Sequence, residues 1–453
     1  MFIHRSGSST KASRPGLSRL DGSQTSRMRL TRRSLLGLST SLFSSAFLPA
    51  DSYAETNANS RLLIVILRGG MDGLGMVIPK LDPCYEAMRR ELAIPLSTTL
   101  SIGSDFGLQP SLPVVHAMFE AGEAAVIPAV GLPVRNRSHF ECQDNLENGL
   151  PINITNATGW LNRLLGSLPP GDPIRTCRAI EIGDVPLILR GAEPVLGWSP
   201  TWFEKANYFT RWKTSSIYKR ADLALYSSLN FGLEANRFAV ESGAVETQQL
   251  SVLRKGFIGA ARLLRAPGGP RIAVLSIQGW DTHSQQGGAT GLFNDRLSEL
   301  DTALGDLKSE IGSLWPNLVV ACVSEFGRTI PTNGDSGTDH GVGTAALVLG
   351  GAVKGGIYGD WPGLSKAMLV DGTALRPTVD MRSIFKGILK AHIGVPQEIL
   401  ESIVFPGSIG AVPLEALVAF PLYTTKTLWR YAAPPRLQET YPIARYRRRH
   451  GNG

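Results

Sequence analysis

Carboxylates and imidazoles follow several short apolar runs of this sequence, and such side chains bind metal ions and move protons. Asp281 and His283 lie two residues apart in QGWDTHSQQGG at 278–288. In extended backbone, residues i and i+2 point the same way, so both side chains can reach one ion. Carboxylate oxygen and imidazole nitrogen together are a typical donor set for a divalent metal. A hydrogen-bonded Asp–His pair without metal is the alternative for this segment.

A second Asp–His pair, Asp339 and His340, lies in a glycine-rich segment at 324–351. Adjacent Asp and His can share one metal where the backbone is irregular, and Gly341 and Gly343 permit this. The same pattern is also typical of a surface loop in which the aspartate forms a turn.

Two more candidates stand near the start of that segment, in SEFGRT. Glu325 is placed either to bind the metal directly or to orient one of the metal ligands through a hydrogen bond. Arg328 carries a guanidinium that could bind an oxyanion. We expect both residues to belong to the catalytic machinery.

Asp72 stands in RGGMDGLGMVIP at 68–79, where glycines let the backbone turn tightly and approach a ligand closely. Its carboxylate offers a hard oxygen ligand, although an aspartate that caps a structural turn gives the same pattern. A dinucleotide-binding loop is excluded, because Ile78 occupies the place of the third glycine.

The segment GLPVRNRSHFECQDN at 131–145 predicts a helix that begins at Ser138 or His139. Free N–H groups and the dipole at a helix start stabilise an anion, and Arg135 and Arg137 add positive charge. A hydroxyl group there suits a nucleophile at a phosphoryl or sulfuryl centre, so Ser138 is the candidate nucleophile. Serine is equally a preferred helix N-cap.

Short, mostly apolar runs predict the strands that position these residues, since strands buried on both faces of a parallel sheet have this composition. The runs are RLLIVIL at 61–67, AAVIPAV at 124–130, RIAVLSI at 271–277, NLVVACV at 317–323 and TAALVLG at 344–350. Apolar residues spaced three or four apart over 292–311 predict an amphipathic helix between them.

This alternation predicts a doubly wound α/β sheet, mostly parallel, in which ligands bind off the carboxyl ends of the strands. Residues from about 150 to 250 are less regular. We expect them to form an inserted cap beside the sheet.

The first 54 residues have the composition of an export signal. Residues 1–33 hold eight Lys and Arg against one acid, and the apolar stretch 34–48 is diluted with Ser and Gly. The two arginines of TRRSLLG fit the twin-arginine pattern, and cleavage is expected after Ala54. An ordinary secretory signal or an uncleaved anchor is the alternative.

The stretch 34–48 is too short and too polar for a comfortable membrane span. We therefore expect a periplasmic or extracellular protein with no stable membrane insertion after signal cleavage. Its partner during export would be the twin-arginine translocase.

The two ends of the chain account for its basic composition. The net charge is +8, of which residues 1–54 carry +6 and residues 430–453 carry +5. The body at 55–429 is therefore about −3, which excludes a nucleic-acid footprint on it. The basic tail is expected to be a solvated run.

Four widely spaced cysteines without a CxxC motif give no support for a thiolate metal site and allow one or two disulfides.

Taken in order, five segments resemble a bacterial family of exported proteins called domain of unknown function 1501. The segments are ILRGGMDGL, RSHFECQDNLENG, GWDTHSQQGG, SEFGRT and TDHGVG. That family is similar in turn to the alkaline phosphatase and sulfatase superfamily, whose doubly wound α/β fold holds one or two divalent metals. The resemblance implies an alkaline phosphatase-like domain over 55–429, with the cap inserted at about 150–250.

Carried onto this sequence, the superfamily's functional residues fall on two Asp–His pairs, a first aspartate and a serine. The implied metal ligands are Asp72, Asp281, His283, Asp339 and His340, and the implied nucleophile is Ser138. Two features depart from the pattern. The first Asp and His are two rather than four residues apart, and the only later histidine before the tail, His392, lies in the apolar run ILKAHIG.

These observations predict an exported, metal-dependent hydrolase of phosphate or sulfate esters. Its cofactor would be a divalent metal (zinc, calcium or magnesium) and its partner a small anionic ester. An exported, non-catalytic binding or scaffold protein on the same fold is the alternative, and the missing late histidine favours it.

Overall fold

The computed structural model describes residues 59–134, 136–152, 157–183, 186–200, 207–245 and 249–419. The predicted export signal at 1–54, with its cleavage site after Ala54, lies outside these residues, as do Arg135 and the basic tail at 430–453.

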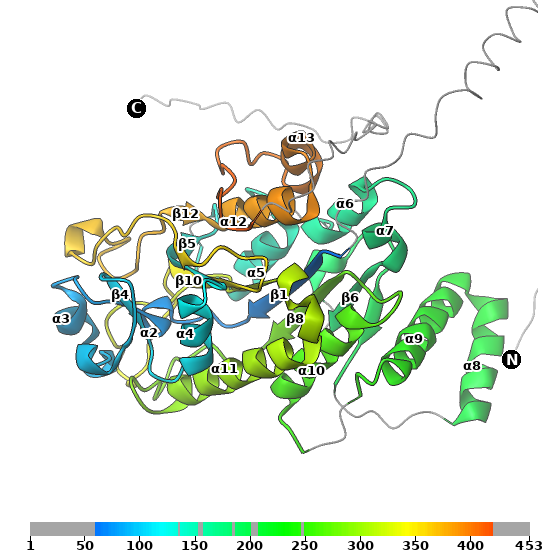
Figure 1. Ribbon diagram of the computed structural model, residues 1–453, viewed down its shortest axis with the longest axis horizontal. Coiled ribbons are helices and arrows are strands. Elements are labelled where there is room, and N and C mark those ends of the chain that lie inside the picture. The colour runs from blue at the N-terminus through cyan, green and yellow to red at the C-terminus, as the bar shows by residue number, and fades with distance from the viewer. Residues whose placement is uncertain are drawn as a thin grey trace, which may run out of the picture. The chain divides into compact units, whose positions relative to one another are not determined.

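A nine-stranded sheet forms the centre of the described residues (Figure 1). Its strands are β1 (Arg61–Leu67), β5 (Ala124–Gly131), β6 (Ala179–Ile182), β7 (Leu196–Trp198), β8 (Ile272–Ile277), β9 (Leu318–Val323), β10 (Thr344–Leu349), β11 (Gly356–Ile357) and β12 (Val379–Asp380). They lie in the order β11-β5-β10-β9-β1-β8-β6-β7, with β12 paired to β5. The predicted α/β sheet is thereby confirmed, and so are all five predicted strands.

One predicted strand runs in the direction opposite to the one expected. β10 is antiparallel to both of its neighbours, β5 and β9, whereas β1 is parallel to β8 and β9. The prediction of a parallel strand was wrong here because an apolar run shows burial and carries no sign of direction. The reversal brings the amino end of β10 to the edge where β1, β8 and β9 end. Residues that precede β10 therefore reach the same edge as residues that follow the other strands.

The side chains of β1 alternate between two hydrophobic cores. Leu63, Val65 and Leu67 belong to one core, and Ile64 and Ile66 belong to the other. Since each fully buried side chain of this size contributes about 1.5–3 kcal/mol, the strand is held strongly on both faces.

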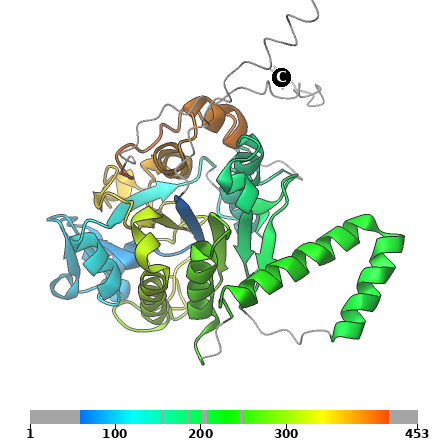
Figure 2. The same cartoon turned by 45° about the vertical axis from the view of Figure 1, so that its right-hand side comes forward.

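Helices cover both faces of the sheet (Figure 2). The core that contains Leu63 is closed by α4 (Pro113–Glu120), α10 (Val252–Arg265) and α11 (Leu292–Ile311). The opposite core is closed by α5 (His139–Asn148), α6 (Trp160–Ser167) and α12 (Met381–Ile388). Helix α11 has the bounds that the apolar spacing predicted, and that predicted apolar face is buried.

The range 150–250 contributes partly to the sheet itself. β6 and β7 extend the sheet beyond β8, because their short apolar segments pair in parallel register. The part that lies beside the sheet is a helical pair, α8 (Tyr208–Ala221) and α9 (Leu223–Glu241). The expected insertion is therefore smaller than the whole range, since segments of three or four residues are too short to show a period.

The remaining elements are short. A three-stranded sheet has the order β2 (Val77–Pro79), β4 (Phe106–Leu108) and β3 (Leu100–Ile102). The short helices are α2 (Gly73–Met76), α3 (Tyr85–Arg89), α7 (Pro173–Cys177) and α13 (Gln397–Ile399). The four cysteines are all free thiols. None of the helices in the described ranges combines the length and apolar character that crossing a membrane requires.

Candidate metal centre

Three histidines and an aspartate, which come from three separate segments of the chain, meet at one edge of the sheet. His139 is the first residue of α5, shortly after β5. Asp281 and His283 follow β8, and His340 precedes β10 by four residues. The reversed direction of β10 is what brings His340 to this edge.

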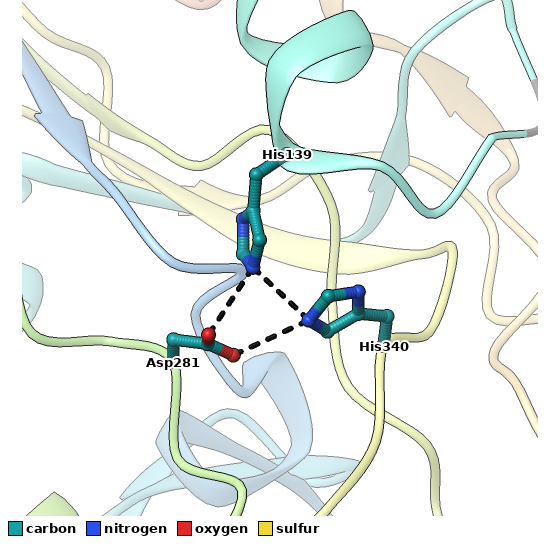
Figure 3. A group of neighbouring side chains, drawn as sticks. All are labelled: His139, Asp281 and His340. Carbon is teal, nitrogen blue, oxygen red and sulfur yellow. Dashed lines mark hydrogen bonds and ion pairs between the residues drawn. The ribbon is translucent and has the colours of Figure 1, made fainter.

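His139, Asp281 and His340 form a compact group of potential ligands (Figure 3). The Nε2 atom of His139 lies 3.0 Å from Nε2 of His340 and 3.3 Å from Oδ2 of Asp281. The Nε2 atom of His340 lies 3.4 Å from Oδ1 of Asp281. In a tetrahedral site with bonds of about 2.0 Å, ligand atoms are about 3.3 Å apart. The three residues therefore have the spacing that a single ion of this size requires.

Hydrogen bonds on the far side of both rings determine their tautomers. His340 Nδ1 lies 2.7 Å from the carbonyl oxygen of Arg137, which can only accept, so this nitrogen is protonated. His139 Nδ1 lies 2.9 Å from Oε1 of Glu325 and donates to it in the same way. When both rings are neutral, each Nε2 therefore carries a lone pair. Two such lone pairs facing each other at 3.0 Å repel unless a cation lies between them.

His283 brings a further imidazole nitrogen to the edge of this group. Its Nε2 atom lies 2.9 Å from Nε2 of His340 and 3.1 Å from Oδ1 of Asp281. It stands beside the group of three in which every ligand atom lies within 4.8 Å of the others. The predicted alternation across Thr282 accounts for this placement, because Thr282 is buried and bonds to Gln286 instead.

Glu325 orients His139 from a buried position. Its Oε1 atom accepts from His139, from the amide of Gly69 and from Nε2 of Gln143, each at 2.9 Å. Burial alone would raise the pKa of Glu325, but the hydrogen bonds from His139 and Gln143 hold it below its ordinary value. In turn, the bond to Glu325 raises the pKa of His139. Glu325 thus lies behind His139, which is one of the two positions that the sequence left open for it.

Arg328 orients Asp281 and is only 2% exposed. Its Nη1 atom donates to Oδ1 of Asp281 at 2.6 Å, and its Nε atom donates to Oγ1 of Thr338 at 3.0 Å. It also donates to the carbonyl oxygen of Thr338. Burial alone would raise the pKa of Asp281, but the bond and charge of Arg328 hold it below its ordinary value. These bonds already engage the buried guanidinium, which favours a positioning role for Arg328 over the expected oxyanion-binding role.

Asp72 lies apart from the three-residue group. Its Oδ1 atom caps α2 by accepting from the amides of Leu74 and Gly75 at 3.2 Å. Its Oδ2 atom accepts from Arg89 and, at 2.5 Å, from Nε2 of Gln286. These contacts engage both carboxylate oxygens, and the buried guanidinium of Arg89 balances the charge of Asp72, which favours a structural role over the expected role as a metal ligand.

The other two predicted residues lie at the rim of the centre. Asp339 is exposed, and its Oδ1 atom lies 3.5 Å from Nδ1 of His283, which itself stands beside the group of three. Ser138 is the N-cap of α5 by position, yet its side chain makes no capping hydrogen bond. Its hydroxyl is thus not committed to the helix amides.

Two glycines allow the loops to approach this closely. A Cβ atom on Gly69 would lie 2.3 Å from the amide nitrogen of Asp281, and Gly69 has φ +121°. A Cβ atom on Gly341 would lie 2.4 Å from the carbonyl oxygen of Arg328. Only glycine lets the loop after β1 and the segment around His340 pack against their neighbours.

His139 is the residue of this group that sequence reasoning missed as a ligand. It was considered only as the start of a helix, beside the serine that resembles a nucleophile. The available signal was its position: the loop after β5 ends at the same edge as the loop after β8, so a histidine there can meet Asp281.

The sequence model of the family described as "Protein of unknown function (DUF1501)" matches residues 234–404. This range contains GWDTHSQQGG, SEFGRT and TDHGVG, so the resemblance predicted from these motifs is confirmed over this part of the chain. No curated protein sequence is detectably similar to the chain.

Several solved structures are similar to the chain at 10% identity. The structure of Ps i-CgsB in complex with k-i-k-neocarrahexaose has a TM-score of 0.39, covering 78% of this chain and 77% of that one. The phosphonate monoester hydrolase of Agrobacterium radiobacter has a TM-score of 0.34, with 74% of each chain covered. The lipoteichoic acid synthase LtaP from Listeria monocytogenes has a TM-score of 0.35, with 80% and 78% covered. The TM-scores lie below 0.5, and the function proposed below rests on the site itself.

Proposed function

We propose that this protein is a metal-dependent hydrolase of phosphate or sulfate esters, with a divalent metal held by His139, Asp281 and His340. The observation that carries the proposal is the opposed pair of Nε2 atoms, 3.0 Å apart, whose rings both use Nδ1 as a donor on the far side. A proton on Nε2 of His139 would remove the repulsion between these two lone pairs only. A divalent cation satisfies both lone pairs and the nearby carboxylate at once.

The donor set favours zinc or a similar transition metal over calcium or magnesium. Two imidazole nitrogens and one carboxylate oxygen suit zinc, whereas calcium and magnesium take oxygen ligands. Three protein ligands leave a position open, which is typical of catalytic rather than structural zinc. The Nε2 atom of His283, 2.9 Å from Nε2 of His340, is a further imidazole nitrogen beside these three residues.

When bound, such a metal polarises ester oxygens and lowers the pKa of a hydroxyl group or water next to it. The protein's own contribution begins with Ser138, whose uncommitted hydroxyl directly precedes the ligand His139 at the start of α5. The free N–H groups of the first helical turn can then stabilise negative charge on the transferred group. Ser138 remains the proposed nucleophile on these grounds.

The supporting residues hold the ligands rather than act on the substrate. Glu325 keeps Nδ1 of His139 protonated, which leaves Nε2 free to bind. Arg328 keeps Asp281 ionised and fixed in orientation. We further propose, from the composition of residues 1–54, export by the twin-arginine route to the periplasm or cell exterior.

Elemental analysis of the purified protein, together with a screen of phosphate and sulfate esters, tests this proposal. We expect one equivalent of metal in the wild type, and loss of both metal and hydrolysis in His139→Ala. The matched control is Asp339→Ala, an exposed carboxylate beside the centre that should keep its metal. Metal content unchanged in His139→Ala would overturn the assignment.

A non-catalytic metal-binding protein is the second candidate, and one observation favours it. Arg328, the cation closest to Asp281, is buried and engaged, so it presents little positive charge to an anionic ester. Stoichiometric metal without turnover of any ester in the screen would support this candidate. Metal-dependent turnover that is lost in Ser138→Ala, with metal retained, would exclude it.

A further inference from the structure

Helix α8 exposes large apolar side chains along its length. No residue of α8 is buried. The side chains of Tyr208, Phe209, Trp212 and Ile217 are 78%, 64%, 56% and 52% exposed. Single exposed apolar residues are ordinary, but several of them on one short helix mark an interaction surface.

The same helix is strongly basic. It carries Arg211, Lys213, Lys219 and Arg220, all exposed, and no acidic residue. The ion pairs found among the described residues involve none of these four. This local charge of +4 contrasts with the slightly negative body of the chain. A partner of complementary charge must therefore be anionic.

The way α8 is held leaves its outer surface free. Asp222 ends α8 and also caps α9, where its Oδ1 atom accepts from the amides of Ala224 and Leu225. Helix α9 packs toward the sheet through Ala235 and Ala239, and α8 lies on its outer side (Figure 2). Leu223, at the turn between the helices, is 71% exposed. The exposed apolar surface thus continues from α8 around the turn.

We propose that α8 and the turn at Leu223 form a docking surface for an anionic lipid membrane, independently of the function of the metal centre. Aromatic side chains favour the headgroup level of a bilayer, and lysine and arginine reach lipid phosphates from beside them. Fourteen residues of helix span about 21 Å, less than the hydrocarbon thickness of about 30 Å, so α8 lies along the surface.

The distribution of side chains around α8 indicates shallow binding. Phe209, Lys213 and Arg220 share one side of the helix, and Tyr208, Trp212 and Lys219 share the next, since these positions differ by multiples of about 3.6 residues. Basic and aromatic groups are therefore interleaved rather than on opposite faces. Such a surface suits the headgroup layer, where both kinds of group are satisfied, better than the acyl interior.

Flotation of the protein with vesicles tests the proposal. We expect binding to vesicles of phosphatidylcholine mixed with phosphatidylglycerol, and weak binding to phosphatidylcholine alone. The double variant Lys213→Glu/Arg220→Glu should bind the anionic vesicles about 30-fold or more weakly, because each basic residue near an anionic surface contributes substantially. High salt should weaken wild-type binding, because it shortens the reach of surface charge.

The matched control for charge is Lys354→Glu/Lys366→Glu, which makes the same change in net charge at two exposed lysines elsewhere. It should bind like the wild type. Phe209→Ser/Trp212→Ser should lose about tenfold or more in binding. All four α8 positions are exposed, so the variants should keep the wild-type circular dichroism and melting temperature.

Three outcomes would overturn the proposal. Equal weakening by the Lys354 and Lys366 control would mean that total charge, not α8, decides binding. Unchanged binding in both α8 variants, with loss only when the basic residues at 430–453 are replaced, would assign the contact to that segment. Self-association in sedimentation that the α8 variants abolish, without vesicle binding by the wild type, would make the surface a contact between copies of the chain.

Discussion

The Nε2 atoms of His139 and His340 face each other at 3.0 Å, while Nδ1 of each ring donates to an acceptor on the far side. In the neutral form, each ring therefore has its proton on Nδ1 and a free lone pair on Nε2. Each ring is turned so that its free lone pair points at the same small volume, and Asp281 lies beside that volume at the lower left of Figure 3.

Metal should stabilise the folded protein if this volume holds an ion. At a free zinc concentration 100-fold above Kd, we expect the free energy of unfolding to rise by about 2.7 kcal/mol. Differential scanning calorimetry before and after chelation measures the shift. His340→Ala should show none, whereas His116→Ala, whose ring contacts Ser101 and Glu120, should behave like the wild type. An equal shift in His340→Ala would contradict the model of the site.

Replacement of Glu325 by glutamine should weaken metal binding without removing a ligand. The neutral side chain is a poorer acceptor for Nδ1 of His139, and loss of such supporting partners lowers metal affinity by about 10–100-fold. Titration with a competing chelator gives the affinity. Glu123→Gln, which alters a surface pair with Lys308, is the control. Affinity within twofold of the wild type in Glu325→Gln would show that Glu325 does not support the ligand.

Metal affinity should fall as the pH is lowered through the pKa of His139. The bond to Glu325 raises this pKa above its ordinary value, so the proton competes with metal at a higher pH than for a free imidazole. Glu325→Gln removes the cause of the rise and should move the midpoint to lower pH. The pH dependence of metal affinity in the two proteins measures this, and coincident midpoints would contradict it.

The free energy of unfolding of the metal-free protein should depend on pH through the same two residues, His139 and Glu325. The raised pKa of His139 contributes stability that is present at low pH and lost as pH rises through that pKa. The lowered pKa of Glu325 contributes stability that is present at neutral pH and lost as pH falls through it. Denaturant unfolding at a series of pH values should therefore give a maximum between these two pKa values, and the maximum should broaden or vanish in Glu325→Gln.

Asp72 and Arg89 should matter for stability and not for metal content. Both side chains are buried, so Arg89→Met leaves an uncompensated carboxylate and should cost about 3–5 kcal/mol. Asp72→Asn/Arg89→Met should be less destabilised than the sum of the two single variants. Urea unfolding gives these values, and elemental analysis gives the metal. Loss of metal in a folded Asp72→Asn protein would restore Asp72 as a ligand.

Gly69→Ala should lower stability and metal affinity by more than the cost of placing alanine at a positive φ. The new Cβ atom would meet the backbone of Asp281, so the loop that carries this ligand must move. Gly122→Ala is the control, because Gly122 also has a positive φ (+74°) but nothing within 4 Å of the added atom. The control should cost about 1–2 kcal/mol and keep its metal. Gly69→Ala should lose more stability and bind metal more weakly; equal effects would contradict the close approach.

The five predicted strands could be found because nearly all of their residues are apolar, and such runs need burial on both faces. The direction of β10 could not be predicted, because it depends on how the chain enters the sheet between β5 and β9 and not on the residues of the strand. β6 and β7 were missed because AIEI and LGW are too short to show a period. The helix at 292–311 was found because twenty residues repeat one spacing.

For the site, local spacing was informative where two candidate residues share one segment. Asp281 and His283 lie together for the reason that their alternation suggested. The place of Asp72 could not be read in the same way, because its partner Arg89 lies on α3 and meets it only in the folded chain. His139 needed knowledge of which loop ends at which edge, which follows from the strand order and not from neighbouring residues.

The pairing of β1 also sets when the protein can fold during synthesis. β1 pairs with β8 and with β9, whose last residue, Val323, is made 256 residues after Leu67. At ordinary rates of translation this delay is on the order of 10–50 s. Until β8 is complete at Ile277, 210 residues after Leu67, the seven residues of β1 have no strand on either side, and the second side stays open until β9 is made. The nascent chain therefore exposes this apolar segment until its carboxyl-terminal third has been made.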